Sequence, residues 1–198
     1  MMNNKNKVTI GMAILFEIVL IITAISNILS KQWNNLLLSI LAIICIILPF
    51  IITYIAHKKN IILPSSFNII ALLFIFLSIY FGEIRKFYRI LWWWDIFLHS
   101  VFGIYGVIIA LHLMKGIITK NKSVTQKRFG ILIVIFAFTF SISLGTLWEI
   151  FEFLGSYLFK VDMLAGGFED TMLDLIVKSL CAFITSMICY YRDFKTEK

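Results

Sequence analysis

The sequence predicts an all-α integral membrane protein, a helix bundle of about six transmembrane helices with both termini in the cytoplasm. Three observations predict this fold class. Hydrophobic residues make up 61% of the 198 residues and charged residues 15%, with a mean hydropathy of +0.95, whereas soluble domains have about 45–50% and 25%. The apolar residues form six runs of the length that crosses a bilayer, about 20 residues. The basic residues gather between these runs.

The six predicted spans cover residues 8–29, 35–56, 67–83, 92–114, 130–153 and 171–190. The first run follows Lys5 and Lys7, which is the charge order of a signal peptide, but it is longer than an ordinary signal sequence and further spans follow it. We therefore expect an uncleaved helix. The loops are short, so residues 1–198 are expected to form a single membrane domain.

The orientation follows from the lysines and arginines. With the N-terminus inside, the cytoplasmic segments carry twelve of them and the outer loops five, and positive charge concentrates on the cytoplasmic side. The expected location is the bacterial plasma (inner) membrane. The net charge of +7 then reflects topology, and nucleic-acid binding is not expected. Cys45, Cys181 and Cys189 lie inside apolar runs without C-x-x-C spacing, as small core residues do.

Small residues predict which spans pack closely. Gly103, Gly106 and Ala110 lie along the fourth span, and Gly145 lies on the fifth near Trp148. Small side chains let membrane helices approach one another. If these faces meet, the fourth and fifth spans are neighbours.

The acidic residues are distributed unevenly. Eight of the eleven fall at the outer ends of spans or in outer loops. Three span ends each carry two metal-capable side chains one helical turn apart: Asp95 with His99, Glu149 with Glu152, and Asp170 with Asp174. Helix bundles build carboxylate-rich metal sites in this way. Mostly oxygen ligands with one nitrogen suit Mg²⁺, Mn²⁺, Fe²⁺ or Zn²⁺.

All six side chains are therefore candidate metal ligands, and His99 and Glu149 are also candidate catalytic bases. Structural alternatives exist for most of them. Thr171-x-x-Asp174 matches a capping box, and Asp174 could pair with Lys178 one turn later.

The other acids, Asp95, Glu149 and Glu152, could lie at headgroup level, where Trp92, Trp93 and Trp94 would form part of an aromatic belt. His99 lies one turn deeper. There an ionisable group costs about 2.5–3.5 kcal/mol at the bilayer centre and indicates a functional site by default.

The motifs Trp94-Asp95-x-x-x-His99, Gly145-x-Leu147-Trp148-Glu149-x-x-Glu152 and Asp170-Thr171-x-x-Asp174 resemble the YjdF-like family of bacterial inner-membrane proteins over about residues 90–190. More distantly they are similar to VanZ-like proteins, which are associated with glycopeptide resistance, although the last motif lacks a clear Arg and Asn. The resemblance implies that the six side chains share one site. It implies no substrate.

Three functions fit these features. The first is metal-assisted hydrolysis or transfer on a lipid-linked envelope substrate, with a divalent cation as cofactor. The second is a non-enzymatic protein that binds an envelope component through its acids. The third is a small proton-coupled transporter that uses Glu17, near the middle of the first span. The residues favour the first and leave the others open. The sequence predicts no oligomeric state.

Overall fold

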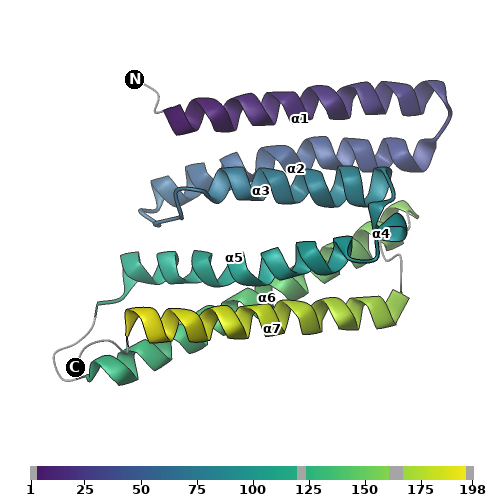
Figure 1. The fold of residues 1–198 in the computed structure, drawn as a ribbon. Coiled ribbons are helices and arrows are strands. Elements are labelled where there is room, and N and C mark those ends of the chain that lie inside the picture. The colour runs from purple at the N-terminus through teal and green to yellow at the C-terminus, as the bar shows by residue number, and fades with distance from the viewer. Residues whose placement is uncertain (1–3, 120–123, 161–166, 195–198) are drawn as a thin grey trace.

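The computed structural model describes residues 4–119, 124–160 and 167–194, and every regular element in these ranges is a helix (Figure 1). In chain order the elements are α1 (Asn4–Leu29), α2 (Trp33–Lys58), α3 (Phe67–Ile75), the π-helix η1 (Phe76–Ile84), α4 (Phe87–Ile90), α5 (Trp94–Ile117), α6 (Gln126–Phe159) and α7 (Gly167–Asp193). With α3 and η1 counted together, six helical stretches in the described residues are long and apolar enough to cross a membrane. The predicted all-α bundle of six spans is confirmed.

The helices form two groups (Figure 1). In the first, α1, α2, α3 and η1 pack together around apolar side chains such as Leu20, Ile46 and Leu72, which are 0–1% exposed. In the second, α5, α6 and α7 pack mutually around smaller side chains, with Ala110 and Ala137 at the centre. The two groups meet mainly where η1 and α4 contact α5.

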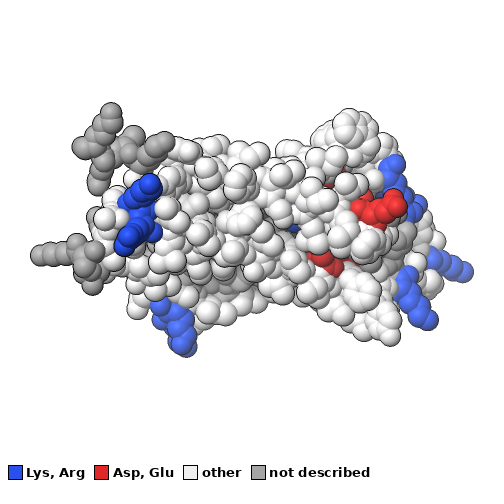
Figure 2. Space-filling model, turned by 90° about the horizontal axis from the view of Figure 1, so that it is seen from below, with Lys and Arg blue, Asp and Glu red and all other residues white. Residues whose placement is uncertain are grey.

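The ends of the bundle differ in charge. α1 begins and α7 ends at the same end of the molecule (Figure 1). On the face that Figure 2 shows, the acidic side chains gather toward the other end, where α7 begins, and the middle is almost free of charge. An uncharged middle is what the hydrocarbon core of a bilayer requires.

Most helix boundaries differ from the predicted spans by a few residues, and the difference is largest for α6. α6 has 34 residues, about 51 Å at 1.5 Å per residue, where the sequence predicted 130–153. Since a bilayer core is about 30 Å thick, a helix of this length tilts or extends beyond it, and Figure 1 shows α6 crossing obliquely behind α7. α5 begins at Trp94 rather than at residue 92, because the short helix α4 and a turn precede it.

The tryptophans before α5 do not all belong to an aromatic belt. Trp92 and Trp93 are 81% and 43% exposed, as belt residues are. Trp94 is buried, and its ring packs edge-on against Phe87 with the centroids 5.0 Å apart. Trp94 therefore packs inside the bundle and anchors α5 to α4, whereas Trp92 and Trp93 face outward.

The third span ends in a π-helix, η1, which the sequence did not predict. The wider turn places Ser78 and Gly82 toward α4, and the Ser78 hydroxyl shares a hydrogen bond of 2.8 Å with the Tyr88 hydroxyl. A Cβ atom at Gly82 would collide with the Tyr88 ring. Long π-helical segments are rare and occur frequently at functional sites.

The glycines of α5 and α6 allow close helix contacts. A Cβ atom at Gly103 would lie 2.5 Å from the backbone oxygen of Lys178 on α7, and one at Gly106 would collide with Ser141 on α6. The Ser141 hydroxyl donates a hydrogen bond of 2.8 Å to the Gly103 carbonyl oxygen. A Cβ atom at Gly145 would lie 3.0 Å from Cδ of Lys178. Both α6 and α7 therefore pack closely against the glycine-containing face of α5.

We expect Gly103→Ala to lower the thermal unfolding midpoint of the protein in detergent. The new methyl group would press on the backbone of α7, which cannot rotate away as a side chain can, and overpacking costs about 1–3 kcal/mol. Gly11→Ala on α1 is the matched control, since a Cβ atom there meets nothing within 4 Å. The free energy of unfolding of Gly11→Ala should lie within about 1 kcal/mol of the wild-type value, on the stabilising side. Equal midpoints for the two variants would contradict the contact between α5 and α7.

Candidate metal centre

Three helix segments bring the ionisable side chains together. Asp95 and His99 come from the first turns of α5, Glu149 and Glu152 from the second half of α6, and Asp174 from the second turn of α7. Ligand-capable atoms lie within 4.8 Å of one another in two groups that share the imidazole: Asp95, His99 and Asp174, and His99, Glu149 and Glu152. Five of the six predicted residues thus share one site.

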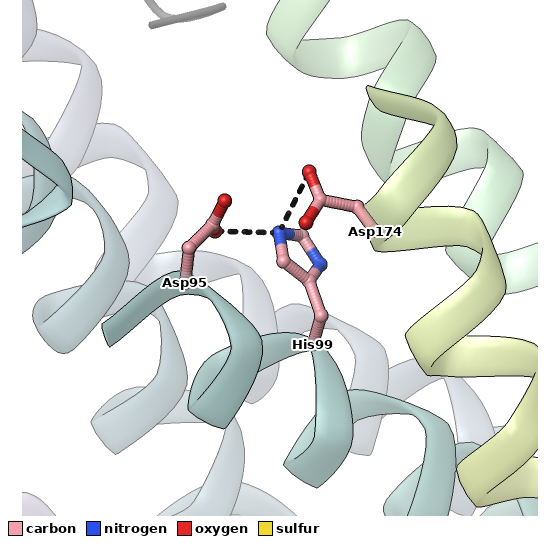
Figure 3. A group of neighbouring side chains, drawn as sticks. All are labelled: Asp95, His99 and Asp174. Carbon is pink, nitrogen blue, oxygen red and sulfur yellow. Dashed lines mark ion pairs between the residues drawn. The ribbon is translucent and has the colours of Figure 1, made fainter. Parts of the chain in front are cut away.

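The Nε2 atom of His99 faces two carboxylates (Figure 3). It lies 2.8 Å from Oδ1 of Asp95 on the same helix and 3.4 Å from Oδ2 of Asp174 on α7. The His99 side chain is only 2% exposed. Carboxylates accept hydrogen bonds but do not donate them when ionised, so the proton of a neutral imidazole belongs on Nε2. This tautomer leaves a lone pair on Nδ1.

The Nδ1 atom of His99 is buried and has no hydrogen-bond partner among the residues that the structure describes. It points toward α6, where Oε1 of Glu149 lies 4.0 Å away. Glu149 and Glu152 are each only 6% exposed. Both acids are therefore enclosed by the bundle rather than exposed to lipid head groups.

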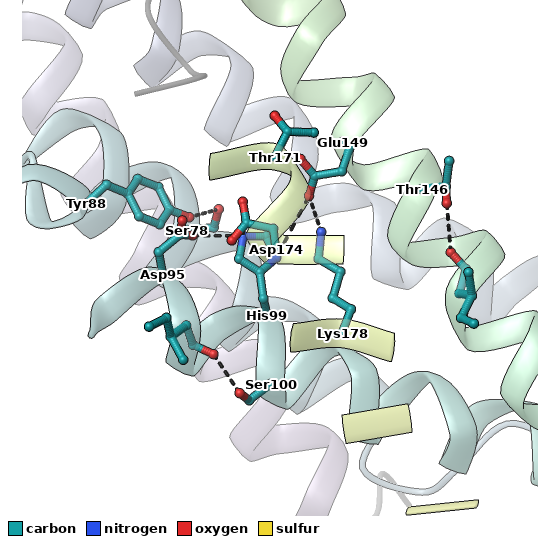
Figure 4. A network of polar contacts seen from close by, with 12 residues as sticks. Ser78, Tyr88, Asp95, His99, Ser100, Thr146, Glu149, Thr171, Asp174 and Lys178 are labelled. Carbon is teal, nitrogen blue, oxygen red and sulfur yellow. Dashed lines mark hydrogen bonds and ion pairs between the residues drawn. The ribbon is translucent and has the colours of Figure 1, made fainter. Parts of the chain in front are cut away.

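Lys178 completes the cluster, although it was not among the predicted site residues. It is 2% exposed, and its ammonium group forms an ion pair with Oε1 of Glu149 (Figure 4). The ammonium also lies 5.8 Å from the centroid of the Phe102 ring, within the range of a cation–π interaction. The stem passes beside Gly145. The predicted pairing of Lys178 with Asp174 is replaced by this contact across two helices.

The cluster carries an excess of negative charge. Four carboxylates, those of Asp95, Glu149, Glu152 and Asp174, face one lysine and one imidazole. Even with His99 protonated, at least two negative charges are unmatched if the acids are ionised. Buried charges need partners, and the cost of leaving one unpaired is several kcal/mol. The acids therefore either bind protons or bind a cation.

The predictions for the start of α7 need correction. The helix begins at Gly167, and the Thr171 hydroxyl donates to the Gly167 carbonyl oxygen at 3.2 Å within the helix. Thr171 is thus not an N-cap, and the capping-box interpretation of Asp174 is wrong. Asp170 lies in the first turn of α7, half-buried. It belongs to neither of the two ligand groups, because it lies a full turn closer to the helix end than Asp174.

Tyr88 lies beside the site and was also missed by the sequence analysis. Burial raises the pKa of Tyr88 well above its usual value, and the nearby carboxylate of Glu152 raises it further, against the opposing effect of the Ser78 hydrogen bond. The hydroxyl thus stays protonated at neutral pH. No motif marks it, whereas Lys178 had one available signal: an ionisable residue inside a span indicates function by default.

The remaining titratable candidates lie elsewhere. Glu17 is half-buried on α1, which packs against α2 and α3 and thus belongs to the other helix group. His112 lies far along α5, where its Nδ1 atom lies 2.9 Å from the Ile108 carbonyl oxygen. Cys45 and Cys189 are buried and Cys181 is half-buried, as expected of small core side chains.

Comparisons with known proteins match most of the chain to one family of membrane proteins. A family model described as "Predicted membrane protein (DUF2238)" matches residues 8–194. An uncharacterized protein of Thermotoga maritima is 28% identical over 142 residues, which are 72% of this chain and 69% of that protein. No solved structure matches. Neither description mentions a YjdF-like or VanZ-like protein, so those two relationships stay predictions.

We expect Lys178→Met to destabilise the protein strongly. It removes the cation from a buried pair and leaves the Glu149 carboxylate without its ammonium partner, a change that typically costs about 3–5 kcal/mol. The double variant Lys178→Met/Glu149→Gln removes both charges and should recover most of the loss. Thermal unfolding of the three proteins in detergent measures this coupling. If the double variant is no more stable than Lys178→Met alone, the ion pair does not contribute as the structure indicates.

Proposed function

The chain belongs to the DUF2238 family of predicted membrane proteins, and we propose that it binds a divalent cation between α5, α6 and α7 and uses it for hydrolysis or transfer on a lipid-linked substrate. The observation that carries the proposal is the buried, unpartnered Nδ1 atom of His99, which faces two enclosed carboxylates. A buried nitrogen lone pair beside buried acids is costly unless a cation or a proton lies between them.

The ligands proposed are Nδ1 of His99 and the carboxylates of Glu149 and Glu152. Two atoms that bind one ion at 2.0–2.2 Å lie at most about 4.4 Å apart, and Nδ1 lies 4.0 Å from Oε1 of Glu149. Asp95 then acts as the partner that metal-bound histidines usually have, a carboxylate on the other ring nitrogen that fixes tautomer and orientation. Asp174 supports the same nitrogen from α7.

The ligand chemistry narrows the choice of cation. Carboxylates suit Mg²⁺ and Mn²⁺, while imidazole suits Zn²⁺ and Fe²⁺. Two carboxylates and one imidazole together therefore suit Zn²⁺, Mn²⁺ or Fe²⁺ best. With His99 neutral as a ligand, the four carboxylates exceed Lys178 by three negative charges if all are ionised; a divalent cation offsets two of these and a monovalent cation only one.

The residues have distinct roles in this proposal. A bound divalent cation supplies a Lewis acid for a phosphoryl or carbonyl oxygen and an acidified water molecule. Because His99 and Glu149 serve as ligands, neither is available as the general base that the sequence predicted for them. Asp174 is the remaining buried carboxylate beside the imidazole, and we assign it the role of proton acceptor. Lys178 holds Glu149 in position and offers a positive charge to an anionic oxygen.

The orientation of the protein is part of the proposal. We infer that both termini face the cytoplasm and that the site lies near the outer surface of a bacterial plasma membrane. The segments then placed in the cytoplasm carry twelve basic residues and the outer loops five, which supports this orientation. The two termini also lie on one side, since α1 begins at the same end of the molecule at which α7 ends (Figure 1).

Metal analysis tests the cation. We expect purified wild-type protein, loaded with Mn²⁺ or Zn²⁺ and desalted, to retain about one ion per chain, and His99→Ala/Glu149→Ala to retain less than a tenth of that. Asp95→Asn should weaken affinity about 10–100-fold, the usual effect of removing the partner of a metal-bound histidine. Glu169→Gln is the matched control, since Glu169 is an exposed acid in the first turn of α7. Near-zero occupancy in both the wild type and the double variant would refute the metal site.

Reporter fusions test the orientation. Green fluorescent protein fused after residue 198 should fluoresce, because it folds in the cytoplasm. Alkaline phosphatase, which is active only outside the cytoplasm, should be inactive at that position and active when inserted after Lys31, in the turn between α1 and α2. The reverse pattern would place the site on the cytoplasmic side.

A further inference from the structure

A second feature of the structure, an apolar groove between the two helix groups, adjoins the metal centre. We call it the α3–α5 groove; it has a volume of about 250 Å³ and is lined by side chains of α2, α3, α5 and α6. Representative lining residues are Ala71 and Phe74 on α3, Tyr105 on α5 and Trp148 on α6. Ligand pockets that enclose whole small molecules usually measure 300–1,000 Å³, so this groove suits a single chain rather than a whole ligand.

The groove arises from the way the helix groups meet. They contact mainly at η1 and α4, whereas α3 meets α5 through individual side-chain pairs, such as Phe74 and Phe102 with ring centroids 5.1 Å apart. At the far end a hydrogen bond of 3.0 Å between the Ser66 and Tyr105 hydroxyls bridges the two groups. On α3 the lining extends from Phe67 to Ile75, about 12 Å at 1.5 Å per residue. Most lining side chains are only partly buried, so the groove faces the hydrocarbon core of the bilayer.

Three aromatic rings connect the groove to the metal centre. Phe74, Phe102 and Trp148 form a cluster with centroid distances of 4.8–6.1 Å. Phe102 carries the Lys178 ammonium over its ring, and Trp148 immediately precedes Glu149. Phe102 and Trp148 therefore form the boundary between the apolar groove and the buried polar site. An occupant of the groove that displaces these rings meets Lys178 and Glu149 directly behind them.

We propose that the α3–α5 groove binds the hydrocarbon chain of an amphiphile whose phosphate head group reaches the metal centre. This inference rests on the proposed function, for which it defines the substrate class. Charge complementarity favours phosphate. Without a cation the four carboxylates would repel an anionic head group, whereas a bound divalent cation would offer coordination positions to phosphate oxygens, with the Lys178 ammonium close by. Binding of the head group is therefore expected to depend on the metal.

Photolabelling in vesicles tests the groove. The probe is phosphatidylglycerol with a diazirine in one acyl chain, and the control probe is diacylglycerol with the same chain but no phosphate. In the presence of Mn²⁺ we expect peptide mapping to place most of the label on the lining residues of α3 and α5, and little on the exposed face of α1 around Ile22. Removal of metal with EDTA should reduce the phospholipid label at least threefold and leave the diacylglycerol label unchanged.

Two variants of α3 provide a matched comparison. Ala71→Trp fills the groove and should reduce the groove label at least fivefold. Leu73→Trp adds similar bulk on the outer face of the same helix, where Leu73 is 36% exposed, and should have no effect. Both variants should retain the wild-type metal content, which shows that the fold around the site is intact.

The possible outcomes separate the two proposals. Even labelling of all lipid-facing helices, or an unchanged label in Ala71→Trp, means that only bulk lipid occupies the groove and overturns the inference. Groove labelling that EDTA does not change also overturns it, because the chain would then bind without its head group in the site. An unlabelled groove in a dimeric protein would mean that a second copy fills it. Failure of the wild type to bind metal would instead overturn the proposed function.

Discussion

The close approach of α5, α6 and α7 around buried charge is the constraint on which the rest of the structure depends. Carboxylates in a medium of low dielectric must be matched by protons or cations, and water cannot perform this role inside the bundle. Gly103 lets the backbone of α7 at Lys178 approach α5, and Gly145 leaves room for the Lys178 side chain, which reaches Glu149 on α6. The same contacts exclude lipid from the acids. A single set of small residues thus explains both the packing and the electrostatics.

The first helix group supports this site indirectly. Its own core is made of large apolar side chains, and the stacked rings of Phe16 and Phe76, with centroids 4.0 Å apart, join α1 to the start of η1. η1 in turn holds α4 through the hydrogen bond between Ser78 and Tyr88. Trp94 packs on α4 at the first turn of α5. The position of Asp95 is therefore set by a chain of contacts that begins in the other half of the molecule.

The sequence was sufficient for the features that depend on spacing along one helix, and insufficient for those that depend on how helices rotate against one another. Span length and apolarity predicted the six helices, and four-residue spacing placed Asp95 beside His99 correctly. The sequence shows that Lys178 lies within a span, but it does not show the ion-pair partner of Lys178, which lies 29 residues away on another helix. No local pattern encodes that choice. The π-helix and the start of α7 at Gly167 likewise lack a sequence signal, so Asp170 was grouped with Asp174 although helix depth separates them.

The depth of the site also bears on the route by which a substrate arrives. His99 and Glu149 are nearly inaccessible between three packed helices, so a bulky water-soluble molecule has no wide path to them through the described residues. A membrane-embedded molecule approaches from another side, through the groove beside α3 and α5, where the rings of Phe102 and Trp148 border the site. Exclusion of water strengthens every electrostatic interaction at such a site, because the local dielectric falls. A buried acidic centre bordered by an apolar groove is therefore better suited to a polar group delivered from within the bilayer than to one delivered from solution.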